Sequence, residues 1–267
     1  MVNIKINGIE YAVEEGTTIL EACRQNGIKI PTLCWLKDIN AIGACRICVV
    51  EMTGARSLVA SCVYPLSKFD EGKNILTHSP AVLQSRKMTL QLLLSDHNMD
   101  CLACSRNGSC ELQELCKELG VDDTTFFEGE KNEYDIDYSS KHMFRDNNKC
   151  IHCRRCIAAC DKLQGIGVIG ANNRGFKTSI DCAFDLDLAE TACVSCGQCI
   201  VACPTGALAE KDDTDKVWDA LADPEKVVVV QTAPAVRASL GEAFGYGYTR
   251  RGQDGCGSSQ TRLQCRI

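Results

Sequence analysis

The sequence predicts an α+β chain assembled from several small domains rather than one large core. Near the N-terminus, apolar and polar residues alternate in two short segments joined by Asn7-Gly8, a pair that favours a β-hairpin turn. Ser79-Pro80 has the capping signals of a longer helix. The cysteines fall into short, closely spaced runs separated by polar segments. Each run is therefore expected to organise a small domain of its own.

Composition limits what can hold these domains together. The chain has 267 residues, 20 of them cysteines, and a net charge of −6. Disulfide scaffolds are typical of short secreted chains, but the N-terminal residues lack the apolar region of a signal peptide and the thiols have metal-ligand spacings. We therefore expect a reducing, cytoplasmic localisation. No apolar run of about 18 residues predicts a membrane span, and the acidic charge argues against nucleic acid as the main partner.

The first domain, residues 1–78, is predicted to have a β-grasp fold. Val2–Ile6 and residues 11–13 form the two hairpin strands. Thr18 and Glu21 form a capping box for a short helix that ends at Asn26-Gly27. Strand, hairpin and helix in this order favour that fold. Cys23 lies on the apolar face of the helix and is predicted to pack in the core.

Four cysteines of this domain have the spacing C-x₁₀-C-x₂-C-x₁₃-C. The plant-type 2Fe-2S pattern is C-x₄-C-x₂-C with a distant fourth cysteine, so only the first gap departs from it. The small residues Gly43 and Ala44 are expected to let backbone N–H groups approach the sulfurs. The alternative is four buried structural cysteines. We predict a 2Fe-2S cluster held by Cys34, Cys45, Cys48 and Cys62.

The second domain, residues 79–120, is predicted to be small and helical. Its first helix starts at Ser79-Pro80 and leads to His97. A second helix is predicted from Glu111 to Leu119, closed by Gly120, with Cys116 in a packing role. One imidazole and three thiolates suit either a 4Fe-4S cluster or a Cys₃His zinc site, and the residues alone leave both open. The predicted ligands are His97, Cys101, Cys104 and Cys110.

Residues 121–149 are acidic and polar, which favours a solvated linker over an acidic docking site.

The third domain, residues 140–212, contains two runs with the spacing C-x₂-C-x₂-C-x₃-C, and Pro204 follows the second. This spacing is typical of a bacterial two-cluster ferredoxin, in which the fourth cysteine of each run ligates the other cluster. Two zinc ribbons, the alternative, would lack a third cysteine in phase. Residues 165–187 are predicted to form a β-hairpin insertion with an unligated Cys182. The predicted sets are Cys150, Cys153, Cys156 and Cys203 for one 4Fe-4S cluster, and Cys193, Cys196, Cys199 and Cys160 for the other.

After this domain, a helix is predicted over residues 215–223, with Thr214 as its N-cap and Pro224 as its stop. A strand is predicted over residues 227–230 because four valines follow one another there.

Two motifs add a family resemblance. The first resembles the 2Fe-2S signature of two families, the large iron–sulfur subunit of respiratory complex I and the multi-cluster iron-only (FeFe) hydrogenases. Both families carry a His-ligated 4Fe-4S cluster at the position of His97, so the resemblance implies a cluster there rather than zinc. Its neutral imidazole is expected to raise the cluster's potential. The motif is Pro31-x-x-Cys34-Trp35-x₇-Gly43-x-Cys45-Arg46-x-Cys48.

The second motif, residues 231–237 with the sequence QTAPAVR, resembles the beginning of the catalytic domain of the hydrogenases and not complex I. The resemblance covers roughly residues 1–245. It implies the iron–sulfur region of an NAD(P)-coupled hydrogenase, with residues 213–245 as the start of a truncated catalytic domain.

The last residues depart from that family. Its H-cluster motifs, Thr-Ser-Cys-Cys-Pro, Met-Pro-Cys and Cys-x-Gly-Gly-Cys, do not occur in this sequence. Residues 246–267 are polar and Gly-rich, and Cys256 and Cys265 have no ligand spacing. Codons for this tail can be chosen so that a one-nucleotide shift encodes an amphipathic, family-like segment. We therefore expect a frameshift near Gly245, in the gene or in its sequencing.

These predictions together indicate an electron-transfer relay with one 2Fe-2S and three 4Fe-4S clusters. The resemblance implies the electron-input part of an iron-only hydrogenase in a hetero-oligomer, with a flavin-containing, NAD(P)H-oxidising subunit or a ferredoxin as redox partner. We find no nucleophile–base pair or nucleotide motif, and the chain by itself is not expected to make hydrogen. The alternatives are the iron–sulfur subunit of an NADH or formate dehydrogenase and a stand-alone poly-ferredoxin carrier.

Overall fold

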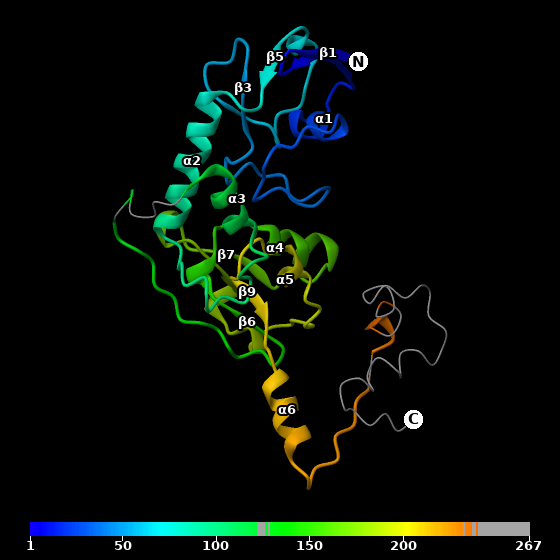
Figure 1. The fold of residues 1–267 in the computed structure, drawn as a ribbon, viewed down its shortest axis with the longest axis vertical. Helices are drawn as coiled ribbons and strands as arrows, with labels where there is room; N and C mark the ends of the chain where they lie inside the picture. Colours follow the sequence, from blue (N-terminus) through cyan, green and yellow to red (C-terminus); the bar gives the residue numbers. More distant parts are fainter. Residues whose placement is uncertain (122–125, 128, 232, 237–238, 240–267) are drawn as a thin grey trace. The chain divides into compact units, whose positions relative to one another are not determined.

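The computed structural model describes residues 1–121, 126–127, 129–231, 233–236 and 239 (Figure 1). The chain divides into two units, Met1–Lys211 and Asp212–Ile267. The first unit mixes short helices and strands, so the predicted α+β class is confirmed. Among the helices of the described residues, none combines the length and the apolar character that a bilayer span demands. The predicted frameshifted tail lies outside the described residues, as do Thr232 and Arg237 of the hydrogenase-like motif.

The first domain is built on a five-stranded sheet with the order β2-β1-β5-β3-β4. β1 pairs antiparallel with β2, as the Asn7-Gly8 turn predicts, and parallel with β5. The helix α1 (Ile19–Gln25) begins with the predicted capping box, in which the side chains and backbone N–H groups of Thr18 and Glu21 bond reciprocally. The strands are β1 (Val2–Ile6), β2 (Ile9–Val13), β3 (Val49–Met52), β4 (Val59–Ala60) and β5 (Asn74–Leu76).

Apolar side chains of this sheet and of α1 form a common core, to which Ile4, Leu20 and Ile75 contribute. Cys23 is fully buried in it, as predicted. Burial raises the pKa of this thiol to about 11, so it stays neutral and behaves as a small apolar side chain.

Two helices connect the sheet with the third domain. Figure 1 shows α2 (Pro80–Ser95) running from the sheet toward α3 (Glu111–Leu119). α2 starts where predicted, with the Ser79 hydroxyl accepting the Val82 N–H at 3.4 Å. α3 ends where predicted, with Gly120 at a φ of 61°. Both helices share a second core with the cluster loops of the first and third domains, which contains Leu33, Ile47, Leu90, Leu94, Leu112, Leu115 and Ile151.

The third domain consists of short elements around the two cysteine runs. The predicted hairpin insertion is present as β7 (Ile169–Asn172) paired antiparallel with β8 (Ser179–Cys182). A second pair joins β6 (Met143–Arg145) and β9 (Leu208–Glu210). The first run enters α4 (Arg155–Ala158), which continues as a π-helical turn over Ala159–Leu163, and the second run enters α5 (Gln198–Ala202).

The prediction of a solvated linker over residues 121–149 is wrong for its second half. Residues 143–145 form β6, and Asp137 exchanges two backbone hydrogen bonds with Arg145. The Arg145 guanidinium also lies 3.2 Å from the Asp137 carboxylate and 2.5 Å from that of Asp181, and the side chains of Arg145 and Asp137 are only 7% exposed. A buried guanidinium requires counter-charges, and these two carboxylates supply them. They therefore belong to the folded interior rather than to a solvated linker.

Two predictions beyond residue 211 also need correction. The helix α6 spans Thr214–Ala222, so Thr214 is its first residue rather than its N-cap, and the Asp212 carboxylate accepts the Thr214 N–H at 2.9 Å. Residues 227–230 are not a strand: Val227 is 91% exposed, and no described strand pairs with this segment. A run of valines forms a strand only where a neighbouring strand completes its hydrogen bonds.

Candidate metal centres

The four cysteines predicted to hold a 2Fe-2S cluster are brought together between β3, β4 and the loop before them. All four are buried, with 1–7% of each residue exposed. Hydrogen bonding with the neighbouring thiols lowers the pKa of Cys34 and of Cys48 and raises the pKa of Cys45 and of Cys62. Four buried thiols coupled in this way fit the ligand set of an iron–sulfur cluster.

Backbone conformation explains how the 2Fe-2S loop reaches its sulfurs. Gly43 has a φ of 63°, which is strained for a residue with a Cβ, and a Cβ there would lie 3.1 Å from the Val63 side chain, so the position favours glycine. Arg46 has a φ of 58° between two of the ligands. The backbone N–H groups of Cys45 and Ala44 also lower the pKa of Cys34, after the larger effect of the neighbouring thiols. Backbone dipoles aimed at the sulfurs stabilise negative charge.

The His97 site lies where α2 ends and the loop before α3 begins. His97 is 8% exposed, and its Nδ1 has no hydrogen-bond partner. Burial lowers the pKa of the imidazole to about 4, so the ring is neutral at pH 7 and a nitrogen lone pair is free for a metal. Cys101, Cys104 and Cys110 are partly exposed. Burial is the main cause that raises the pKa of Cys110, and the nearby Cys104 and Cys101 thiols raise it further. One neutral imidazole and three thiols are donors that either a 4Fe-4S cluster or a zinc ion accepts.

The two cysteine runs of the third domain form two separate groups of four. We name the first the inner site; its thiols line one small cavity, and they are Cys150, Cys153, Cys156 and Cys203. We name the second the outer site; its thiols line another cavity, and they are Cys160, Cys193, Cys196 and Cys199. The fourth cysteine of each run therefore lies with the three leading cysteines of the other run, in the arrangement that a two-cluster ferredoxin requires.

Both runs share an unusual backbone. His152 (φ 52°) and Arg154 (φ 59°) occupy the same places in the first run as Ser195 (φ 53°) and Gly197 (φ 74°) in the second. Left-handed φ values are uncommon for residues with a Cβ and cost roughly 1 kcal/mol or more each. They turn amides toward sulfur: the His152 N–H lies 3.4 Å from Cys150 Sγ. His152 thus contacts the inner site through its backbone.

The inner site is covered by the other two domains. The Asn40 side-chain amide donates to the Cys34 carbonyl at 2.7 Å and to the Cys153 carbonyl at 3.1 Å, and Asn40 is buried. Cys34, Cys45 and Cys153 also belong to one apolar cluster. One amide therefore connects the backbone of a 2Fe-2S ligand with that of an inner-site ligand.

The His97 site also adjoins the inner site. A Cβ at Gly206, three residues after Cys203, would lie 2.5 Å from Cys104 Sγ, so glycine permits this approach. The Glu111 N–H donates to the Pro204 carbonyl at 3.0 Å, and the Glu111 carboxylate pairs with the Arg155 guanidinium at 2.6 and 2.9 Å.

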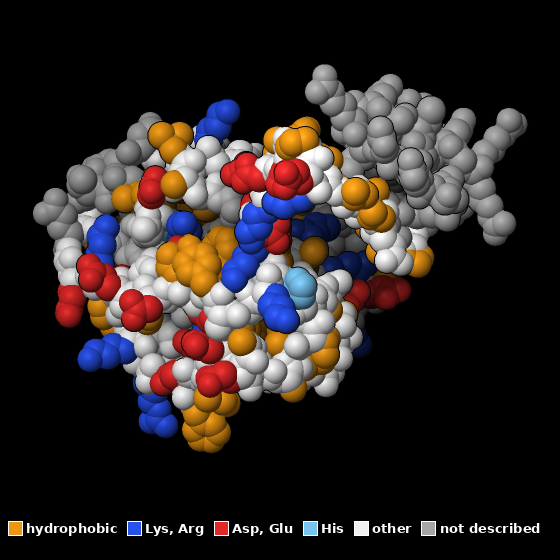
Figure 2. Space-filling view, turned by 90° about the horizontal axis from the view of Figure 1, so that it is seen from below, with side chains coloured by type: hydrophobic (Ala, Val, Ile, Leu, Met, Phe, Trp, Pro, Cys, Tyr) orange, Lys and Arg blue, Asp and Glu red, His pale blue; other side chains and the backbone are white. Residues whose placement is uncertain are grey.

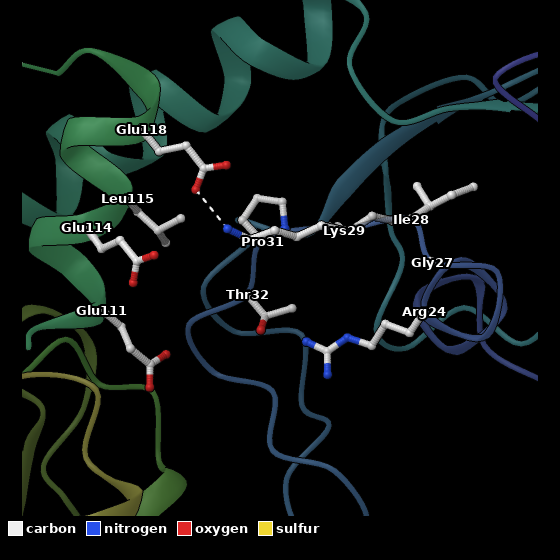
Figure 3. A pocket seen from close by; sticks show the side chains of 11 residues that line it. Arg24, Gly27, Ile28, Lys29, Pro31, Thr32, Glu111, Glu114, Leu115 and Glu118 are labelled. Atoms are coloured by element: carbon white, nitrogen blue, oxygen red, sulfur yellow. Dashed lines mark hydrogen bonds and ion pairs between the residues drawn. The ribbon is translucent and has the colours of Figure 1, made fainter.

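A groove of about 510 Å³ separates α3 from the segment between α1 and Cys34 (Figure 3). Glu111, Glu114 and Glu118 face it from α3, and Arg24 and Lys29 face it from the other side. Among these five residues, only Lys29 and Glu118 form a salt bridge with each other, at 3.3 Å. On the face seen in Figure 2, acidic and basic side chains are interspersed rather than gathered into one field of a single sign.

Two functional candidates were missed from the sequence, Asn40 and Arg86. Asn40 carries no sequence signal because its two acceptors come from different domains. Arg86 has one: with Val82, Leu90 and Leu94 it forms the buried row of α2, where an arginine is out of place.

Three protein families match successive parts of the chain. Residues 1–79 match a 2Fe-2S iron–sulfur cluster binding domain, residues 86–125 the NADH-ubiquinone oxidoreductase-G iron–sulfur binding region, and residues 149–207 a 4Fe-4S dicluster domain. A chain in the crystal structure of an NAD⁺-reducing [NiFe]-hydrogenase in its H₂-reduced state superposes with a TM-score of 0.72 at 28% identity. This match covers 79% of the present chain and 87% of that chain.

Relatives with curated names include hydrogenase and complex I subunits. The chain is 46% identical to the NADP-reducing hydrogenase subunit HndD of Solidesulfovibrio fructosivorans over 92% of its length, and 39% identical to iron hydrogenase 1 of Clostridium pasteurianum over 99%. It covers 42% and 45% of these relatives, less than half of each. The 75 kDa subunit of NADH-ubiquinone oxidoreductase from Reclinomonas americana is 34% identical over 79% of the chain, which covers 30% of it. The chain thus carries an iron–sulfur region of the kind found in NAD(P)-coupled iron hydrogenases.

Proposed function

We propose that this chain relays single electrons through one 2Fe-2S and three 4Fe-4S clusters, as the electron-input region of an iron-only hydrogenase. The observation that carries the proposal is the contact of all three ligand-bearing domains around the inner site, with Asn40 bonded to the carbonyls of Cys34 and Cys153. When bound, such clusters supply one-electron redox centres. The chain's own residues hold the centres, shield them from water and fix their separation.

The proposed ligands follow the three domains. Residues 1–78 hold the 2Fe-2S cluster, residues 79–120 the His-ligated 4Fe-4S cluster, and residues 140–212 the inner and outer clusters. For the His-ligated cluster, the neutral imidazole and the partnerless Nδ1 of His97 support the assignment. We further propose that residues 213–245 begin a catalytic domain. Alignment to hydrogenases over 92–99% of the chain, against 79% for the complex I subunit, supports this.

The proposed redox partner is a flavin-containing, NAD(P)H-oxidising subunit or a ferredoxin in a hetero-oligomer. One relative is a subunit of an NADP-reducing hydrogenase. The grouping of cysteines into sets of four with metal-ligand spacing supports a reducing, cytoplasmic compartment.

A second candidate is the iron–sulfur subunit of another NAD-linked oxidoreductase. The observation that favours it is the [NiFe]-hydrogenase structure, where a chain of which 87% is covered has the same fold. An electron relay is common to both candidates.

The proposal is tested with the full chain after anaerobic reconstitution, by iron and zinc analysis and by electron paramagnetic resonance (EPR) of the reduced protein. His97→Ala should lose about four irons per chain and one EPR signal, while the other three signals persist. His142→Ala is the matched control, because this exposed histidine lies outside every proposed site. An unchanged iron count in His97→Ala, or zinc in place of iron in the wild-type chain, would contradict the assignment.

A further inference from the structure

α2 places an arginine in the apolar core beside the 2Fe-2S loop. Val82, Arg86, Leu90 and Leu94 occupy successive turns of one buried helix face, and Arg86 is 1% exposed. A charged side chain is almost never buried to this extent unless an opposite charge compensates it, because removing the charge from water costs several kcal/mol.

The described residues supply Arg86 with only partial compensation. Its Nη2 donates to the Val49 carbonyl at 2.8 Å, and its Nε has no hydrogen-bond partner. No carboxylate of the described residues forms an ion pair with Arg86. Glu118, the carboxylate that affects the Arg86 pKa, forms its ion pair with Lys29 instead. Burial lowers the pKa of Arg86 to about 10, against the opposing effects of Cys48 and then Glu118, so the guanidinium remains charged at neutral pH.

The loop that carries the Val49 carbonyl also carries a ligand of the proposed 2Fe-2S site. That ligand is Cys48, the residue before Val49, and negative charge on Cys48 opposes the lowering of the Arg86 pKa. A 2Fe-2S centre held by four thiolates carries net negative charge, which grows by one when the centre accepts an electron. Charges separated by apolar side chains interact more strongly than charges separated by water.

We propose that Arg86 is the counter-charge of the 2Fe-2S cluster and raises its reduction potential by stabilising the reduced form. The step is the transfer of one electron from the redox partner to the cluster, with no proton taken up, because the charge that balances it is already buried. This inference rests on the proposed 2Fe-2S ligand set. It assigns to α2, a helix of the neighbouring domain, control over how readily the relay accepts its electrons.

The test is an EPR-monitored redox titration of the full, reconstituted chain. In Arg86→Gln, the ratio of reduced to oxidised 2Fe-2S cluster at a fixed potential should fall roughly tenfold, a shift of about 59 mV to lower potential for one electron. The outer 4Fe-4S cluster should keep its potential. Lys87→Gln is the matched control. Lys87 is the next residue in the chain and its side chain is exposed, so this variant removes the same charge from a solvated position and should leave every potential unchanged.

An unchanged 2Fe-2S potential in Arg86→Gln overturns the proposal. If that variant does not retain the 2Fe-2S signal, Arg86→Lys decides, because it keeps the charge and alters the hydrogen bonding. A retained signal at the wild-type potential in Arg86→Lys supports the proposal. Loss of the signal, or a lowered potential, means that Arg86 acts by holding the Val49 loop, and overturns it. Absence of a 2Fe-2S signal from the wild-type chain would instead refute the ligand set.

Discussion

The inner and outer sites of the third domain have the same cysteine spacing and the same left-handed backbone positions, yet their surroundings differ. At the inner site, Cys153, Cys156 and Cys203 are buried, and both other domains contact the loops around them. At the outer site, Cys196 is exposed and Cys193 partly exposed, and the nearby Val194 is 63% exposed. A repeated motif thus produces two equivalent ligand sets with unequal access to water.

This difference suggests an order for the relay within the described unit. The inner site is the one that both the 2Fe-2S loop and the His97 loop approach, through Asn40 and through Gly206. The outer site has ligands at the surface. We therefore expect the inner cluster to lie on the path between the 2Fe-2S cluster and the outer cluster.

The largest expected effect separates the two sites by removing one crossing ligand at a time. Cys203→Ala should lose the inner cluster, about four irons per chain, and interrupt electron transfer from the 2Fe-2S to the outer cluster. Cys160→Ala should lose the outer cluster and leave transfer to the inner cluster intact. Iron analysis and EPR after rapid photoreduction measure both effects.

Cys182→Ser is the control for these variants, because Cys182 is buried and accepts a hydrogen bond from Arg145 at 3.3 Å but lies outside both sites. It should retain all iron. Loss of the outer cluster in Cys203→Ala and of the inner cluster in Cys160→Ala would mean that the ligands do not cross.

A smaller effect is expected from an iron chelator that competes under mild oxidation. The outer cluster should be lost several-fold faster than the inner cluster, because Cys196 and Cys193 are reached from solvent. The decay of each EPR signal during incubation measures the two rates. Equal rates, or faster loss of the inner cluster, would contradict the protective role of the surrounding domains.

The smallest effect is expected at Asn40. Asn40→Ala removes the amide that connects the carbonyls of Cys34 and Cys153, so transfer from the 2Fe-2S to the inner cluster should slow several-fold without loss of iron. Flash photoreduction followed by absorbance measures this rate. Lys162→Ala is the matched control, since it removes another contact between the same domains, the 2.7 Å bond from Lys162 Nζ to the Ile39 carbonyl, which touches neither cysteine. Equal slowing in both variants would assign the effect to domain packing rather than to Asn40.

Local interactions made much of this fold predictable. The Asn7-Gly8 turn, the capping box of α1, the Ser79-Pro80 start of α2 and the Gly120 end of α3 each depend on residues within a few positions of one another. Errors arose where the partner is distant. Val227 and its neighbours have the composition of a strand, but no described strand lies beside them. Asp137 has the character of a linker residue in the sequence, and only the fold brings Arg145 into an ion pair with it.

The sequence by itself determined the elements that carry local capping or turn signals and the thiols that could share a centre, because capping and cysteine spacing are short-range properties. Only the tertiary structure decided how those centres differ. Asn40 joins two ligand loops, Arg86 is buried with its Nη2 on the Val49 carbonyl next to Cys48, and the outer site, unlike the inner site, has a fully exposed thiol. These features arise from contacts between domains, and both burial and the strength of a charge depend on what surrounds a residue in space.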